Sequence, residues 1–379
     1  MNSLRIFGLS VALLAPSQAA EPTKPDQVLP RGYVAYRTST PITIDGRLDD
    51  AAWEAVPWWE DHVDIEGFEK TVPRFGTRGK MLWDDTYLYV AAYLDEPHVW
   101  GTLTRHDSVI FQDNDFEVFI DPDGNNQQYY EIEINALNTE WDLRLVKAYR
   151  NGGPALNEWE IPGLRHATHV DGTLNHPYDT DKGWSVEFAF PWQSLNEFAN
   201  CPCPPNDGDQ WRVNFSRVQW VVDIMDGAYR KVAGRPEDNW IWSPQGFVDM
   251  HRPETWGFLQ FSMVEAGKGV VALRRDPDYP ARMYLMKVYF AQADFKGRHG
   301  RWASSVEELG LAGNSVPEKA RIDANKRLED MGLAPKDNAP FAASARIEVT
   351  EPGYKASVDS TRGGRWYVRE DSRLWHDAK

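Results

Sequence analysis

Acidic and amide side chains recur at alternate positions along several β-like segments of this 379-residue chain. One such segment alternates two isoleucines with three polar residues: Ile132 and Ile134, and Glu131, Glu133 and Asn135. Alternate residues of a strand point to the same side of a sheet, so the polar groups share one face. Carboxylates and amides on such a face can hydrogen-bond hydroxyl groups, and paired carboxylates can act as general acid and base.

Other segments repeat this pattern. Glu117 alternates with Phe116 and Val118, and Glu187 alternates with Val186 and Phe188. Aromatic residues in the intervening loops include Phe111, Trp240 and Trp242. Planar hydrogen-bonding groups beside an aromatic ring face suit a sugar, which presents both hydroxyl and C–H groups. The alternative is an ordinary antiparallel sheet with one solvated face.

A catalytic interpretation of the same carboxylates stays open. Glycosidases place two carboxyl groups about 5–10 Å apart, and same-face neighbours on a strand are about 6.6 Å apart. Glu117, Glu131 and Glu133 are therefore candidates for a glycoside hydrolase. Such spacing is common on any polar strand, so a non-catalytic binding protein is favoured. The sequence contains no nucleophile elbow, phosphate-binding loop or HExxH zinc motif.

A candidate calcium loop follows the segment that contains Glu117. Asp121, Asp123 and Asn125 place oxygen ligands at alternate positions, a spacing that suits Ca²⁺. A turn rich in Asp, Asn and Gly is the alternative interpretation.

The charge balance argues against two classes of partner. The chain has 57 Asp and Glu residues against 41 Lys and Arg residues, a formal net charge of −16. Nucleic acids and anionic membrane surfaces attract basic proteins, so neither is expected as a partner. The 17 Trp residues are the other unusual feature. Five of them lie in strand or framework segments and are expected in the core: Trp53, Trp83, Trp184, Trp211 and Trp256.

The first 20 residues have the pattern of a secretory signal peptide. Arg5 precedes a short apolar run, and Ser17-Gln18-Ala19 is typical of a cleavage site near Ala19 or Ala20. Residues 21–33 form a polar linker. No later apolar run is long enough for a membrane anchor. We therefore expect a secreted or periplasmic protein.

Two domains are expected after the linker. Residues 34–262 consist of short alternating runs separated by Gly, Pro, Asn and Asp, which predicts a mainly β fold, an antiparallel, jelly-roll-like β-sandwich. Residues 263–379 are expected to form a small α+β domain of unknown role. Helical periodicity predicts helices at 280–297 and 304–310, and three short strands follow at 346–349, 355–358 and 365–369.

Several sequence blocks resemble, in order, the family 9 carbohydrate-binding module. They begin with Ile44-Asp45-Gly46-Arg47-Leu48-Asp49-Asp50-Ala51-Ala52-Trp53. Lys80 to Val90, Asp115 to Gly124, Tyr129 to Asn135, Gly183 to Glu187 and Trp256-Gly257 follow. The resemblance covers about residues 34–262. It implies a sugar-binding β-sandwich with structural calcium, often attached to secreted polysaccharide-degrading enzymes.

The resemblance also implies a set of ligand-binding residues. The family's sugar-binding glutamate, asparagine and later polar position match Glu117, Asn135 and Ser216. One aromatic residue of its sugar clamp matches Phe111. The other aromatic position of the clamp falls near Met250, which has no ring. Trp242 or Phe247 would therefore have to supply the second aromatic face. At the position where the family has an arginine, this chain has Glu133, so the charge there is reversed.

The sequence thus predicts an exported carbohydrate-binding protein that is accessory to polysaccharide breakdown. Structural calcium is the one candidate cofactor, and a separate polysaccharide-degrading enzyme is a candidate partner. Two alternatives remain beside this prediction. One is the glycoside hydrolase described above. The other is a haem-binding or partner-binding module, because the same sandwich occurs in periplasmic haem-binding subunits, and Met250-His251 offers two axial ligand types.

Overall fold

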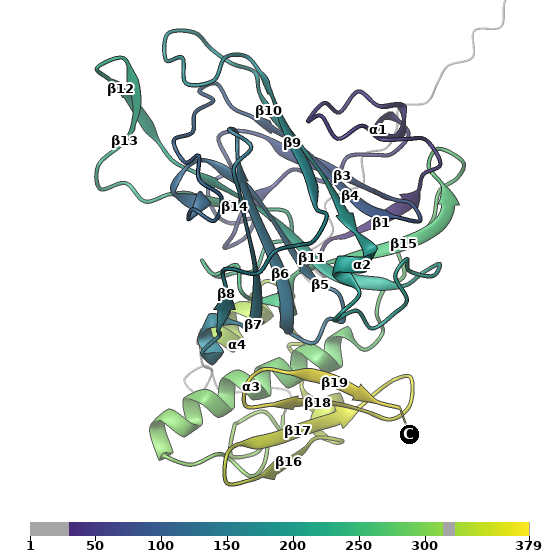
Figure 1. Cartoon of the computed structure of the whole chain (residues 1–379). Helices are drawn as coiled ribbons and strands as arrows, with labels where there is room; N and C mark the ends of the chain where they lie inside the picture. Colours follow the sequence, from purple (N-terminus) through teal and green to yellow (C-terminus); the bar gives the residue numbers. More distant parts are fainter. Residues whose placement is uncertain (1–29, 314–322, 379) are drawn as a thin grey trace, which may run out of the picture.

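The computed structural model of the chain describes residues 30–313 and 323–378. The predicted signal peptide at 1–20 and residues 21–29 of the linker lie outside these ranges. A β-sandwich forms the upper part of the molecule in Figure 1, and the C-terminal region lies beneath it. None of the described helices is long and apolar enough to cross a bilayer.

The sandwich is built from one continuous sheet of 13 strands. Its strands in the first half of the chain are β1 (Gly32–Arg37), β2 (Val63–Asp64), β3 (Thr77–Trp83), β4 (Tyr87–Asp95), β5 (Asp115–Asp121), β6 (Gln127–Asn135), β7 (Glu140–Lys147), β8 (Ala155–Leu156) and β9 (Arg165–Asp171). The later ones are β10 (Gly183–Pro191), β11 (Gln210–Gln219), β14 (Asp238–Ile241) and β15 (Gly257–Glu265). A separate hairpin is formed by β12 (Val222–Met225) and β13 (Ala228–Lys231).

Short helices join these strands. They are α1 (Ala51–Glu54), α2 (Trp192–Leu195) and the 3-10 turns η2 (Ile110–Gln112), η3 (Tyr149–Asn151) and η4 (Pro253–Thr255).

The sheet folds over on itself to make two layers. One layer runs β8-β7-β6-β5-β11-β15 and the other runs β1-β3-β4-β10-β9. Side chains of both layers share one apolar core, in which the rings of Phe116 on β5 and Phe188 on β10 lie 6.5 Å apart. The predicted β-sandwich is therefore confirmed. Strand β1 is the exception to antiparallel pairing, because it pairs in parallel with both β15 and β3 and so connects the two layers.

Alternation along the strands decides which side chains enter the core. Phe116, Val118 and Ile120 all point inward from β5, as their spacing predicts. The five framework tryptophans named above are each at most 1% exposed, as expected. Their N–H groups find acceptors: Trp83 donates to the backbone oxygens of Ala35 and Ser262, both at 3.1 Å. This satisfies a polar group that is costly to bury alone.

The C-terminal region combines one long helix with a small sheet. The helices are α3 (Tyr279–His299), α4 (Asp323–Asp330) and α5 (Ala339–Ala342), and the strands are β16 (Arg346–Val349), β17 (Tyr354–Asp359), β18 (Arg365–Arg369) and β19 (Leu374–Asp377). Helix α3 packs on β17 and β18 around a second apolar core. The helix predicted at 280–297 and the three predicted strands are confirmed, and β19 was not predicted.

The second predicted helix, at 304–310, is wrong. These residues form turns. The Ser304 N–H donates to the Glu308 carboxylate at 2.7 Å, and the Glu308 N–H donates to the Ser305 hydroxyl at 3.4 Å. These hydrogen bonds of Ser304, Ser305 and Glu308 therefore close a turn, and no helix follows it.

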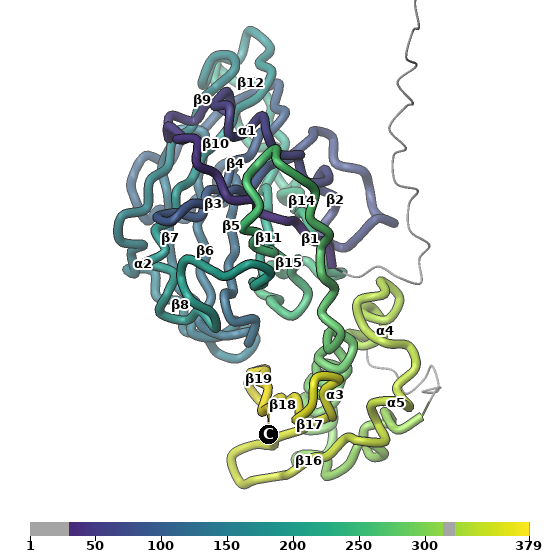
Figure 2. The backbone as a smooth tube through the Cα atoms, turned by 90° about the vertical axis from the view of Figure 1, so that its right-hand side faces the viewer, coloured from purple at the N-terminus to yellow at the C-terminus, as the bar shows by residue number. Residues whose placement is uncertain are grey.

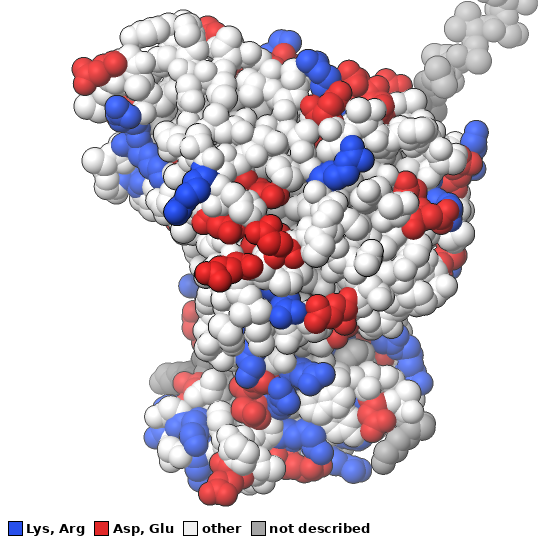
Figure 3. Space-filling view, in the orientation of Figure 1, with Lys and Arg blue, Asp and Glu red and all other residues white. Residues whose placement is uncertain are grey.

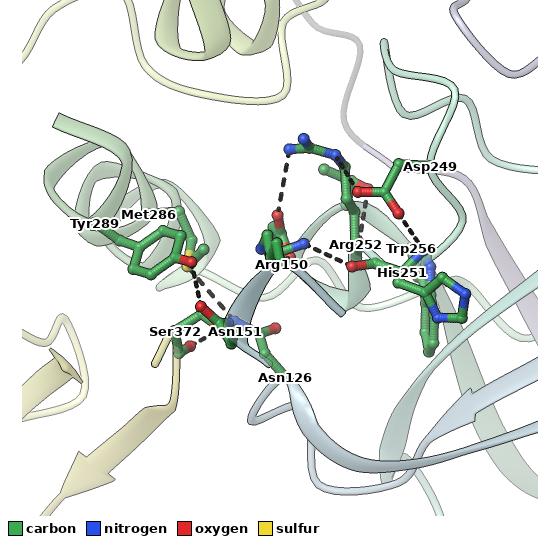
Figure 4. Close-up of polar contacts among 12 residues, drawn as sticks. Asn126, Arg150, Asn151, Asp249, His251, Arg252, Trp256, Met286, Tyr289 and Ser372 are labelled. Carbon is green, nitrogen blue, oxygen red and sulfur yellow. Dashed lines mark hydrogen bonds and ion pairs between the residues drawn. The ribbon is translucent and has the colours of Figure 1, made fainter. Parts of the chain in front are cut away.

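The C-terminal region is fastened to loops at one end of the sandwich, as Figures 1 and 2 both show. The Asn151 side chain accepts a hydrogen bond from the Tyr289 hydroxyl at 2.5 Å and donates one to the Ser372 hydroxyl at 2.7 Å (Figure 4). Asn126 donates to the Ser372 backbone oxygen at 3.0 Å. Polar side chains of the sandwich thus bond both α3 and the β18–β19 turn.

A buried ion pair holds the opposite end of the sandwich. Arg217 on β11 is fully buried and its guanidinium lies 3.1 Å from the Glu96 carboxylate. Gln219 and Asn114 donate to the same Glu96 oxygen at 2.8 and 3.1 Å. Glu96 therefore joins three segments that are far apart in sequence.

Replacing Glu96 should destabilise the sandwich strongly. Glu96→Ala leaves the Arg217 guanidinium buried without its carboxylate, a change that typically costs about 3–5 kcal/mol. Asp294→Ala, which removes an exposed i,i+4 pair with Arg298, is the control and should cost less than about 0.5 kcal/mol. Urea unfolding followed by tryptophan fluorescence measures both. Equal midpoints for the two variants would contradict the role given to Glu96.

Candidate functional site

Four carboxylates gather on the outward side of β5 and β6. Glu117 is the direct cross-strand partner of Glu133 on one side and of Ser216 on the other. Asp115 and Glu131 lie one pleat away from them on the same face. Asp115, Glu117 and Glu133 each offer a carboxylate oxygen within 4.8 Å of the other two. We call Asp115, Glu117, Glu131 and Glu133 the carboxylate cluster.

This face of the sheet is not solvated, contrary to the simple picture of one wet face. Glu117, Glu131 and Glu133 are only 5%, 5% and 2% exposed. Turn η2 covers one end, because the Phe111 N–H donates to Glu133 at 2.9 Å. At the other end, the segment 250–256 packs its apolar side chains on those of β5 and β6. The cluster is therefore enclosed between two loops.

Burial changes the acidity of these groups. Loss of water on burial raises the pKa of Glu117 to about 7. Burial and then the negative charge of Glu117 raise the pKa of Glu131 and that of Glu133 well above the ordinary value. Burial, and then the negative charge of Glu117, also raise the pKa of Asp115 well above its ordinary value. The folded protein thus holds protons on this cluster that free carboxylates would release.

The cluster keeps unsatisfied hydrogen-bonding atoms. Asp115 Oδ2, Glu131 Oε2 and Ser216 Oγ are buried and make no hydrogen bond within the described residues. No Lys, Arg or His of the described chain lies within 4.0 Å of the four carboxylates. Buried polar atoms without partners are rare in folded proteins. They are the groups that a ligand rich in hydroxyls would satisfy.

Aromatic side chains surround this cluster. Trp141 on β7 is the direct cross-strand partner of Glu133, and its N–H has no acceptor among the described residues. Tyr149 is 50% exposed, and after desolvation the charges of Glu131 and Glu133 raise its pKa. With Phe111, which is partly exposed, these rings form a rim beside the carboxylates.

Sequence reasoning missed Trp141 and Tyr149. The segment 140–145 reads Glu-Trp-Asp-Leu-Arg-Leu, an alternation that would have placed Trp141 on the same face as Leu143 and Leu145. Tyr149 follows the strand in a 3-10 turn and leaves no such signal.

Asn135 has a different role from the predicted one. Its amide group donates to the Leu103 backbone oxygen at 2.9 Å and to Asp113 at 3.1 Å. Its oxygen accepts from the N–H groups of Leu137 and Thr139, both at 3.1 Å. Every polar atom of this fully buried side chain is engaged. Asn135 therefore positions the loops beside the cluster, and it has no free group for a ligand.

The second aromatic of the predicted clamp is not where the sequence placed it. Trp242 is fully buried in the core between the layers, so it presents no ring face and the prediction for it is wrong. Phe247 packs with the C-terminal core and lies under the Arg252 guanidinium at 3.7 Å. Met250 does lie on the outer face of the sheet, packed with Trp256 and Phe119.

Met250 and His251 are both engaged in other contacts. The Met250 sulfur accepts from Gln245 at 3.2 Å, and His251 Nδ1 lies 3.1 Å from the Tyr129 hydroxyl. Burial lowers the pKa of His251 to about 4. The His251 backbone N–H also donates to the Asp249 carboxylate at 3.0 Å (Figure 4). These contacts give Met250 and His251 a role in fixing the 249–256 loop, and the haem alternative gains no support.

The predicted calcium loop does not fit a calcium ion. Both oxygens of Asp121 accept backbone N–H groups, from Gly124 and Asn126 at 2.9 Å each. The Arg282 guanidinium bonds the Gly124 oxygen at 2.6 Å and so places positive charge on the turn. Asp123 is engaged within the same turn, because its Oδ1 accepts the Asn125 N–H at 3.1 Å. The Asp and Asn residues close the turn instead.

A second group of possible metal ligands lies on the opposite side of β7 from Trp141. It consists of His106, Asp107, Asp142 and Glu160, whose ligand atoms fall within 4.8 Å of one another. Imidazole with carboxylates is a donor set that zinc accepts. Here His106 Nε2 already lies 2.8 Å from Glu160, which makes an ion pair of these two side chains when the imidazole is protonated.

Comparison with known proteins gives a family and several distant relatives. Residues 44–210 match the family described as carbohydrate family 9 binding domain-like. The chain is 27% identical over 173 residues to exoglucanase XynX of Acetivibrio thermocellus, covering 46% of this chain and 13% of that protein. It is 27% identical over 161 residues to endo-1,4-beta-xylanase A of Thermoanaerobacterium saccharolyticum, covering 41% of this chain and 11% of that protein.

The matched part is thus a small fraction of each enzyme. Among solved structures, a family 9 carbohydrate-binding module of Caldicellulosiruptor kristjanssonii in complex with cellotriose is similar, with 16% identity and a TM-score of 0.38. That match covers 64% of this chain and 100% of that one.

The carboxylate cluster should make stability depend on pH. Because folding raises the pKa of Glu117 from 4.5 to about 7, its contribution is complete below pH 4.5 and is lost as the pH rises through 7. Glu117→Gln removes this titration. The variant should gain on the order of 3 kcal/mol over wild type between pH 4.5 and pH 8. Denaturant unfolding across that range measures the difference, and a difference that is independent of pH would refute the raised pKa.

Proposed function

Because this chain carries a carbohydrate family 9 binding domain-like domain over residues 44–210, we propose that it is a carbohydrate-binding protein whose ligand lies over the carboxylate cluster. The observation that carries this proposal is the row formed by Glu133, Glu117 and Ser216 across three strands. Unsatisfied oxygens of Ser216, Asp115 and Glu131 lie beside partly exposed aromatic rings.

The chemistry of the cluster matches a polyhydroxylated ligand. A sugar hydroxyl both donates and accepts, so it can bond a carboxylate in either protonation state. Phe111 and Trp141 offer ring faces to the C–H groups of a sugar. The enclosed position strengthens each hydrogen bond, because water competes less effectively there.

The same cluster favours uncharged or basic sugars over acidic ones. Its four carboxylates have no basic partner within 4.0 Å in the described chain, so an anionic ligand would meet repulsion. An amino sugar would instead bring a positive charge to a site that lacks one. Glu133 occupies the position where the family resemblance implies an arginine, which is the substitution that creates this preference.

An exported role follows from the chain's N-terminal pattern and its relatives. We infer that the protein is secreted or periplasmic and assists polysaccharide breakdown, together with a separate degrading enzyme. The signal-like residues 1–20 and the two relatives named as an exoglucanase and a xylanase support this inference.

Removing the aromatic rim should weaken sugar binding. Phe111→Ala and Trp141→Ala should each lower affinity about tenfold, equivalent to about 1.4 kcal/mol, because a stacking face is lost. Tyr178→Ala removes a ring that is 74% exposed in a distant loop and should leave affinity unchanged. Isothermal titration calorimetry against gluco-, xylo- and glucosamine oligosaccharides measures all four proteins.

The same samples distinguish binding from hydrolysis. Release of reducing ends by wild type, abolished in Glu133→Gln, would favour the hydrolase alternative. The absence of heat with every saccharide at millimolar concentration would remove the proposal of carbohydrate binding.

A further inference from the structure

A separate cleft lies between the sandwich and the C-terminal region, on a different surface from the carboxylate cluster. Its volume is 520 Å³, within the range of about 300–1,000 Å³ of small-molecule sites. Its walls come from β11, β15, the segment 274–277, α3 and the β17–β18 turn. We call this space the interdomain cleft.

The interdomain cleft is basic although the chain as a whole is acidic. Five arginines line it: Arg212, Arg274, Arg275, Arg282 and Arg362. Three aspartates face them: Asp123, Asp209 and Asp276. The arginines thus outnumber the aspartates in the lining of the cleft. On the visible surface of the C-terminal region, Lys and Arg side chains are mixed with Asp and Glu side chains (Figure 3).

Among these arginines, Arg212 has the most unusual surroundings. Its side chain is 2% exposed and lies flat on the Phe258 ring at 4.0 Å. One terminal nitrogen donates to the Glu254 and Trp256 backbone oxygens. Its Nε and Nη1 atoms make no hydrogen bond within the described residues. A buried guanidinium with two free N–H groups and no carboxylate of its own is unusual, because a buried charge ordinarily has a partner.

A second buried arginine stands beside it. A side-chain carbon at Gly124 would lie 3.2 Å from both Arg212 Cγ and Arg282 Nη2, so these two arginines flank the same glycine. Arg282 reaches Asp276 at 3.3 Å, and Arg362 reaches the same carboxylate at 3.3 Å and that of Asp278 at 2.9 Å. Arg274 lies 3.5 Å from Asp207. Arg282 Nε is also without a partner in the described chain. Asp276 is therefore shared by two arginines and leaves Arg212 uncompensated.

The nearest other carboxylate does not compensate Arg212. Asp121 is fully buried, and both of its oxygens accept backbone N–H groups of its own turn. The guanidinium of Arg212 is thus held in place at the wall of the cleft by Phe258 and by backbone oxygens, and two of its nitrogens are buried without a partner in the described chain. Arginine donors with this arrangement suit the oxygens of a carboxylate or a sulfate group.

We propose that the interdomain cleft binds an oxyanion-bearing ligand, with Arg212 and Arg282 at its floor and Arg362 at its rim. The chemical class is a small carboxylate or sulfate ester, of which a sugar acid is one that fits a cleft of this volume. Because the arginines come from both the sandwich and the C-terminal region, the ligand would bridge the two. This site is independent of the sugar site proposed above.

Calorimetry of the full chain tests this proposal, with sodium sulfate and sodium galacturonate as probes at constant ionic strength. Wild type should bind at least one of them saturably. Arg362→Ala, whose side chain is 54% exposed, and Arg212→Met, which keeps the packing on Phe258, should each weaken that binding at least tenfold. Arg298→Ala, 62% exposed at the far end of α3, should bind the anion as wild type does.

The outcomes separate the two sites and the two anion sources. Galacturonate binding without sulfate binding identifies a carboxylate site, and the reverse identifies a sulfate site. Neutral oligosaccharide binding should be unaffected by Arg362→Ala. If Arg212→Met does not fold, Arg282→Gln replaces it. The proposal is overturned if neither anion binds saturably, or if Arg362→Ala binds the anion as tightly as Arg298→Ala does.

Discussion

Burial of four carboxylates on one face of a sheet is the constraint on which this sandwich depends. Removing ionised groups from water is costly, and within the described chain no basic side chain lies within 4.0 Å to compensate. The structure meets the cost partly by keeping protons on the cluster, as the raised pKa of Glu117 indicates. Hydrogen bonds from the Phe111 and Val218 N–H groups to Glu133 and Asp115 meet another part.

The surrounding elements take their positions from this cluster. Turn η2 is placed by its bond to Glu133, and Asn135 with Asp113 fixes the loop at residues 102–103. On the other end, the 249–256 loop is held by Trp256 and His251 and also adjoins the C-terminal region. The loops that enclose the cluster thus connect it structurally to the second domain, while the basic interdomain cleft provides a second, oppositely charged surface on the same chain.

Much of the fold could be predicted from the sequence, because alternation directly reports which side of a strand is buried. The spacing of Phe116, Val118 and Ile120 identified the core face correctly, and the same rule would have found Trp141. Burial of the opposite face could not be predicted, because it depends on loops from distant segments, such as Met250 lying on β5 and β6. For the same reason, neither the full engagement of Asn135 nor the burial of Trp242 in the core could be predicted.

The central claim is that the carboxylate cluster is the ligand site and holds protons at neutral pH. An NMR titration of ¹³C-labelled glutamate carboxyl groups, assigned with Glu117→Gln, tests it most directly. The account predicts that Glu117 titrates near pH 7 and that saturating saccharide shifts this titration. A Glu117 carboxyl that titrates near its ordinary value of 4.5, and does so identically with and without saccharide, would contradict the account.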